Sequence, residues 1–228
     1  MVQYSLALAL YDYIPIVLFV TGLWLTAKAV EPNAPSMARL MRYAIVLVGL
    51  GGFCKASWKL LIAAFDVNWM LLNDALFVLM APGFTFIAFA IWSVRRQLAN
   101  RPLPATAWRC PASATALGLG LALLLALMLS SNVWFFVLLL QLTVANVLFT
   151  WHAMKFSLSV GSKAAALLFV ANIIGVFVMS GLARVGDPSE AFQWIAQISN
   201  TVTQGSLALA GWLLWQRVKQ PAAVGAMA

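Results

Sequence analysis

Seven apolar runs, each about 20 residues long, fill most of this 228-residue chain. A helix needs about 20 apolar residues to cross the ~30 Å hydrocarbon core of a bilayer. The composition agrees, since 64% of the residues are hydrophobic and the mean hydropathy is +0.94, both outside the range of soluble domains. The period-2 alternation of a membrane β-barrel is absent. We therefore predict an all-α, polytopic membrane protein with seven transmembrane helices in one domain over 1–220, with spans at about 5–27, 43–65, 75–94, 111–130, 133–151, 164–183 and 193–215.

The count of seven depends on one short polar break, from Ser130 to Asn132. Without it, 111–151 would be a single helix of about 41 residues, longer than a bilayer accommodates. The run 111–130 carries almost no polar residues, which predicts a peripheral or connecting helix. Omitting it leaves three spans on either side, so a 3+1+3 arrangement of parallel repeats is an alternative to a bundle without repeats. We expect 221–228 to be a disordered tail.

The net charge of +8 indicates membrane topology rather than nucleic-acid binding. Eleven of the fourteen Lys and Arg residues lie in segments that would share one side of the membrane: Lys28, Arg39, Arg42, Arg95, Arg96, Arg101, Arg109, Lys155, Lys163, Arg217 and Lys219. The acidic residues favour the other side. The positive-inside rule then places the N-terminus outside and the C-terminus in the cytoplasm. We expect a multi-pass protein of a cell membrane, specifically a bacterial inner membrane, whose basic loops attract anionic lipid.

Two lysines, Lys55 and Lys59, interrupt the second apolar run. They lie roughly 15 and 9 Å below the predicted outer surface, where a charge costs about 2.5–3.5 kcal/mol near the helix centre. Asp12 in the first run lies level with Lys59, so we predict an ion pair between them; snorkelling of Lys59 to the headgroups is the alternative. Lys55 lies too deep to snorkel. Unless the span boundary is misplaced, we expect it to face a cavity.

The last apolar run carries a polar stripe of four carboxamides at helical spacing: Gln193, Gln197, Asn200 and Gln204. Such groups commonly hydrogen-bond between membrane helices. Alternatively, they line the same cavity as the lysines, because both features occupy the outer half of the predicted bundle. Pro15 and Pro82 each remove a backbone hydrogen bond within a span, which predicts bends around such a cavity.

Several classes of function are disfavoured by what the sequence lacks. The single histidine, His152, excludes bis-histidine haem and makes a metal site improbable. No hydrolase or phosphate-loop motif is present, so we expect neither catalytic residues nor an enzyme. The layout of seven spans with an outer N-terminus is also that of microbial rhodopsins, but their retinal-binding lysine has no counterpart in 204–211. We therefore expect no cofactor.

The leading hypothesis is a transporter or ligand-binding protein with an outward-facing polar cavity for a small, anionic solute. The candidate ligand-binding residues are Asp12, Lys55, Lys59, Gln197, Asn200 and Gln204. Ammonium and carboxamide donors suit a carboxylate ligand. The alternative is a seven-helix sensor or accessory subunit that acts through its basic cytoplasmic loops, chiefly 95–109, without transport.

Overall fold

The described part of the chain is helical throughout. The computed structural model describes residues 5–101, 103–129, 132–185 and 189–220, and these segments contain helices and turns without a strand. The predicted disordered tail, 221–228, lies outside the described residues. The helices are α1 (Leu6–Tyr11), α2 (Tyr13–Val30), α3 (Pro35–Phe65), α4 (Met70–Leu98), α5 (Arg109–Met128), α6 (Val133–Ser159), α7 (Lys163–Val185) and α8 (Glu190–Lys219).

Six helical stretches in the described residues are long and apolar enough to cross a membrane. They are α1 with α2 counted together, and then each helix from α3 to α7. Helix α8 has 30 residues, enough for about 45 Å, but its polar stripe lowers its hydropathy below that of the other six. The fold is therefore that of a multi-pass helical membrane protein. The seventh crossing stays a prediction.

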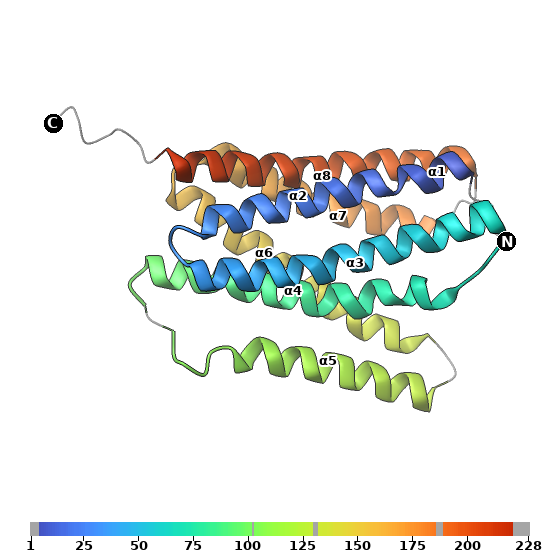
Figure 1. The fold of residues 1–228 in the computed structure, drawn as a ribbon, viewed down its shortest axis with the longest axis horizontal. Coiled ribbons are helices and arrows are strands. Elements are labelled where there is room, and N and C mark those ends of the chain that lie inside the picture. Colours follow the sequence, from blue (N-terminus) through green and yellow to red (C-terminus); the bar gives the residue numbers. More distant parts are fainter. Residues whose placement is uncertain (1–4, 102, 130–131, 186–188, 221–228) are drawn as a thin grey trace.

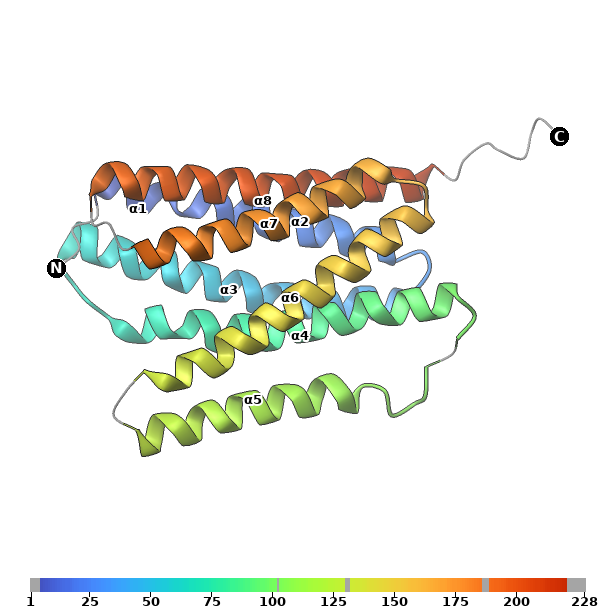
Figure 2. The same ribbon diagram turned by 180° about the vertical axis from the view of Figure 1, so that it is seen from behind.

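The long helices lie side by side and successive ones run in opposite directions (Figure 1). Helix α2 packs between α8 and α3, and α3 packs against α4. On the far side, α6 crosses the bundle obliquely from α5 and α4 to α7 (Figure 2). The α2–α3, α4–α5 and α6–α7 turns lie together at one end, with the C-terminal end of α8. This end carries the eleven cationic residues grouped by the sequence, and we call it the basic end. Its cytoplasmic location stays a prediction.

Helix α5 lies at the edge of the bundle, as its uniform sequence predicted (Figure 2). Only 11% of its apolar, membrane-crossing stretch is buried against the other helices. The separation of α5 from α6 at the predicted polar break is also confirmed, since α5 ends at Met128 and α6 begins at Val133. The 3+1+3 repeat stays a prediction.

Most helices extend beyond the predicted spans. Helix α3 begins eight residues before the predicted start of its span, with Pro35 in its first turn, and α6 ends eight residues after the predicted end of its span. The sequence prediction followed the apolar runs. Backbone hydrogen bonding can continue past the hydrocarbon boundary, so the helices extend beyond the predicted spans, and the span bounds themselves stay a prediction. Of the two prolines expected to cause bends, Pro15 follows an interruption of the helix, since α1 ends at Tyr11 and α2 begins at Tyr13, whereas α4 continues through Pro82.

Glycines set the closest helix contacts. A Cβ on Gly211 of α8 would lie 2.3 Å from the carbonyl oxygen of Gly22 of α2, and one on Gly22 would lie 2.7 Å from the Leu207 backbone. Between α3 and α4, a Cβ on Gly83 would lie 2.4 Å from a Val48 methyl carbon. Small residues of this kind let membrane helices approach closely enough for dense packing. The Gly22–Gly211 contact fixes α2 against α8 and thereby sets how the polar residues of these two helices are aligned.

Candidate functional site

The predicted ion pair between Asp12 and Lys59 is present. Lys59 Nζ lies 2.6 Å from Asp12 Oδ2, and the two side chains are only 16% and 8% exposed. Asp12 lies at the break between α1 and α2, three residues before Pro15. Proline has no backbone N–H, and its ring clashes with the carbonyl group four residues earlier in a regular helix. Charges this well buried persist only when paired. The pair therefore ties α3 to the first two helices and neutralises one of the two lysines.

Lys55 has a partner that the sequence did not suggest. Its Nζ donates to Asn73 Oδ1 in the first turn of α4, and it lies 4.2 Å from the centroid of the Trp58 ring. Asn73 Nδ2 in turn donates to Asp74 Oδ1 at 2.9 Å. The turn from 66 to 69 is short, so the start of α4 lies beside the last turns of α3, within reach of a long side chain.

The two lysines thus serve different neighbours. Lys59 is held by a carboxylate from the α1–α2 side, whereas Lys55 points to α4 and meets a neutral carboxamide. The nearest acid on that side, Asp74, takes part only through Asn73. Of the two ammonium groups, Lys55 is the one whose charge no carboxylate contacts directly within the described residues.

The carboxamide stripe of α8 faces α2. Trp194, next to the start of the stripe, packs edge-on against Tyr11 with ring centroids 5.3 Å apart, and Gly211, beyond its end, contacts Gly22. The stripe positions between them share that helical face. Within it, Gln204 Nε2 donates to Asn200 Oδ1 at 3.1 Å.

Two oxygen atoms of the stripe are buried without a hydrogen-bond partner among the described residues: Oε1 of Gln197 and Oε1 of Gln204. Most buried polar atoms in proteins are hydrogen-bonded, so these two mark a place where a donor from water or a ligand fits. No hydrogen bond or ion pair in the described segments links Gln197, Asn200 or Gln204 to Lys55. The first two helices lie between the stripe and the lysines. The six candidate residues therefore form two separate groups: Asp12, Lys55 and Lys59 on one side of α1–α2, and Gln197, Asn200 and Gln204 on the other.

The basic end shows contacts that the sequence did not predict. Arg95 Nη1 lies 2.8 Å from His152 Nδ1, joining α4 to α6, and Arg217 Nε donates to the carbonyl of Val160 at 3.0 Å. Because an arginine only donates, His152 Nδ1 accepts in this contact. Arg95 and Arg217 therefore link neighbouring helices at the basic end.

The class of protein that these observations support is a multi-pass, helical membrane protein. No protein-family model, curated protein or solved structure matches the chain. Its function has to be inferred from its own residues.

Proposed function

We propose that the protein binds a small, anionic solute at the end of the bundle opposite the basic end, with Lys55 as the anion-binding residue. One observation carries this proposal. Lys55 and Lys59 lie four residues apart on α3. Lys59 is neutralised by Asp12, whereas within the described segments Lys55 contacts the neutral carboxamide of Asn73 and the ring of Trp58 rather than a carboxylate. A partly buried ammonium group without a direct counter-charge attracts an anion, because pairing offsets its desolvation.

The surroundings of Lys55 suit a carboxylate that arrives from outside. Asp74 accepts from Asn73 Nδ2 and thereby keeps Asn73 Oδ1 turned to the lysine. A ligand carboxylate that replaced this oxygen would add a counter-charge to the hydrogen bond that the ammonium group donates, and such pairing offsets the cost of burying the charge. The Trp58 ring beside Lys55 limits where the ammonium group can move, so the exchange would occur at a defined place.

The stripe on α8 would extend this function from binding to transport. Gln197 and Gln204, whose Oε1 atoms are buried without a hydrogen-bond partner among the described residues, belong to α8. Helix α8 packs against α2 and runs to the basic end (Figure 1). Polar groups inside a helical bundle commonly mark a solute path. In this proposal the protein is a transporter of the bacterial inner membrane, with Lys55 and the stripe both in the outer half of the bundle, on either side of α1–α2.

Binding of small carboxylates by the purified protein tests the proposal. The full chain in detergent is titrated with a panel of radiolabelled mono- and dicarboxylates, and Lys55→Gln is compared with the wild type. The control is Lys163→Gln, which removes an equal charge from an exposed position at the basic end. We expect Lys55→Gln to lose at least about tenfold in affinity, the usual cost of one charge-assisted hydrogen bond. Equal affinity of the wild type and a folded Lys55→Gln variant for every bound solute contradicts the proposal.

A second candidate function, docking of a partner without transport, draws on the loop 95–109. Trp108 is 59% exposed there, and Arg101 and Arg109 are exposed as well. Exposed tryptophan beside arginine is typical of the residues that dominate protein interfaces. Recovery of co-purifying proteins by the wild type and by an Arg101→Gln, Arg109→Gln variant distinguishes the two functions. Unchanged recovery counts against docking through this loop.

A further inference from the structure

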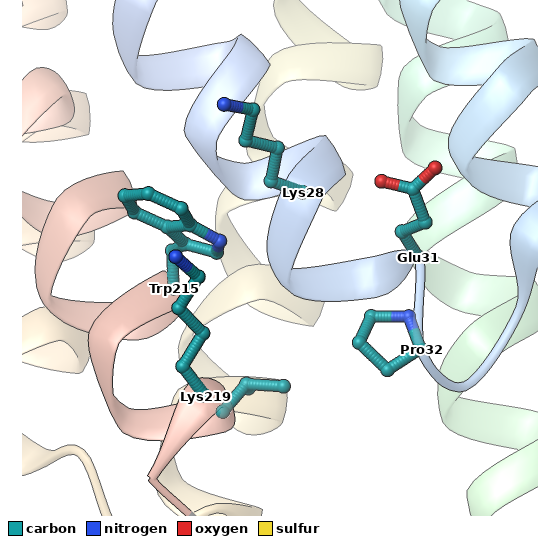
Figure 3. A pocket seen from close by; sticks show the side chains of 6 residues that line it. Lys28, Glu31, Pro32, Trp215 and Lys219 are labelled. Carbon is teal, nitrogen blue, oxygen red and sulfur yellow. The ribbon is translucent and has the colours of Figure 1, made fainter.

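A second charged site lies at the basic end, between the last turns of α2 and α8. A cavity of about 360 Å³ opens there, lined by Lys28, Glu31, Pro32, Trp215, Val218 and Lys219. Figure 3 shows the lysines of the two helices beside the indole of Trp215, with Glu31 and Pro32 across the pocket. Lys219 Nζ lies 3.8 Å and Lys28 Nζ 5.0 Å from the centroid of a Trp215 ring.

The charge in this pocket is uncompensated. Glu31 is its only acidic residue, and Glu31 forms an ion pair with Arg42 outside the lining. No carboxylate in the described segments pairs with Lys28 or Lys219. The indole attracts both ammonium groups through its π-face, and it therefore gathers two like charges that repel each other. An anion bound in the pocket beside the indole would offset that repulsion and attract both ammonium groups.

The position of the pocket selects the kind of anion. Lys28 and Lys219 lie in the last turns of two parallel helices of membrane-crossing length, where a bilayer has its phosphate groups. Trp212, which is 45% exposed, lies on the same face of α8 as Trp215 and Lys219. It precedes Trp215 by one turn and so lies nearer the bilayer centre than Trp215 does. Apolar surface directly beneath a pair of lysines suits a molecule with a charged head and an apolar tail.

We propose that this pocket binds the phosphate of an anionic phospholipid, with Lys28 and Lys219 contacting the phosphate oxygens. Lysine binds phosphate as a compact point charge, and the Trp215 indole N–H supplies a further donor. The acyl chains would lie along the exposed face that includes Trp212. A lipid held in this way joins the ends of α2 and α8, which cross closely at Gly22 and Gly211 about two turns nearer the middle of the bundle.

Native mass spectrometry of the full chain in detergent tests the proposal with three probes. These are dioleoyl phosphatidylglycerol, zwitterionic dioleoyl phosphatidylcholine and inorganic phosphate. We expect the wild type to retain phosphatidylglycerol in preference to phosphatidylcholine. Each lysine near a membrane surface contributes about 1 kcal/mol to anionic-lipid binding, so the Lys28→Gln, Lys219→Gln double variant should bind phosphatidylglycerol about 10- to 30-fold more weakly.

The matched control is the Lys155→Gln, Lys163→Gln double variant. It removes the same charge from the same end of the bundle, and Lys155 lies over another tryptophan, Trp151, at 4.9 Å. It should keep wild-type lipid affinity. An equal loss in both double variants overturns the proposal, because general attraction to basic residues would then explain the binding. Retention of inorganic phosphate without preference for phosphatidylglycerol also overturns it in favour of a soluble phosphate ligand.

Discussion

Neutralising Asp12 should destabilise the bundle much more than neutralising Asp12 and Lys59 together. The two side chains are 8% and 16% exposed in the structure, so the Asp12→Asn variant leaves a nearly buried ammonium group without its counter-charge. Removing one partner of a buried ion pair costs about 3–5 kcal/mol. The insertion cost of a single lysine near the centre of a membrane helix, about 2.5–3.5 kcal/mol, gives a similar figure. We therefore expect a loss of about 3 kcal/mol in the free energy of unfolding.

The same cost applies when the other partner is removed. Lys59→Met leaves the Asp12 carboxylate unpaired and should also lose about 3 kcal/mol. The double variant, Asp12→Asn with Lys59→Met, buries no charge and keeps similar side-chain volumes. It should recover most of the loss, since replacing a buried pair with neutral groups is often close to neutral in free energy. With a loss of about 3 kcal/mol in each single variant and of about 1 kcal/mol or less in the double variant, the coupling energy between the two positions is about 5 kcal/mol.

Reversible unfolding in mixed micelles, with increasing mole fractions of sodium dodecyl sulfate, measures these free energies. The four proteins of the cycle are compared by helical circular dichroism and by elution volume before unfolding. An exposed single-charge change, Lys163→Gln, controls for net charge and should stay within about 0.5 kcal/mol of the wild type. The reasoning is refuted if either single variant loses less than about 1 kcal/mol, or if the double variant loses the sum of the two.

Three further changes follow from named contacts. Asn73→Leu removes the carboxamide oxygen that accepts from the Lys55 ammonium group and should cost about 1–3 kcal/mol in the same unfolding assay; stability equal to wild type would show that this hydrogen bond contributes nothing. Gly211→Val should cost about 1–3 kcal/mol, because its Cβ would lie 2.3 Å from a backbone oxygen, whereas Gly205→Ala, with open space around it, should not destabilise. In a Cys54→Ser background, the exposed Cys110 at the basic end should react with a membrane-impermeant maleimide in inverted vesicles but not in intact cells; the reverse pattern contradicts the predicted orientation.

The membrane helices were predictable from the sequence because their determinant is local. Each apolar run of about 20 residues indicates one crossing by itself, and the short polar break before Val133 sufficed to separate α5 from α6. The Asp12–Lys59 pair was predictable for a related reason. Depth in a bilayer follows from counting residues along each helix, and two opposite charges at one depth on successive helices have few other partners.

The partner of Lys55 was not predictable in the same way. Asn73 lies in the sequence just before the predicted span 75–94, so counting assigned it to the turn. Helix α4 in fact begins at Met70, which brings Asn73 onto the helix beside α3. The helix that the stripe of α8 faces was not predictable either, because four carboxamides at helical spacing define one face of a helix but not the helix packed against it. The contacts of Gly22 with Gly211 and of Tyr11 with Trp194 show that α2, continued by α1, lies opposite the stripe.

The close crossing of α2 and α8 has a consequence for biosynthesis. Helix α2 leaves the ribosome among the first segments and α8 leaves last, so the face of α2 that carries Gly22 has no protein partner until translation is nearly complete. Lys59 emerges much earlier, and Asp12 can be paired as soon as α3 has been inserted. The charged contact thus forms during synthesis, and the close glycine contact forms only at its end. A chain released before α8 would keep its ion pair but expose an unfilled groove along α2, a structural difference by which quality control could distinguish incomplete from complete molecules.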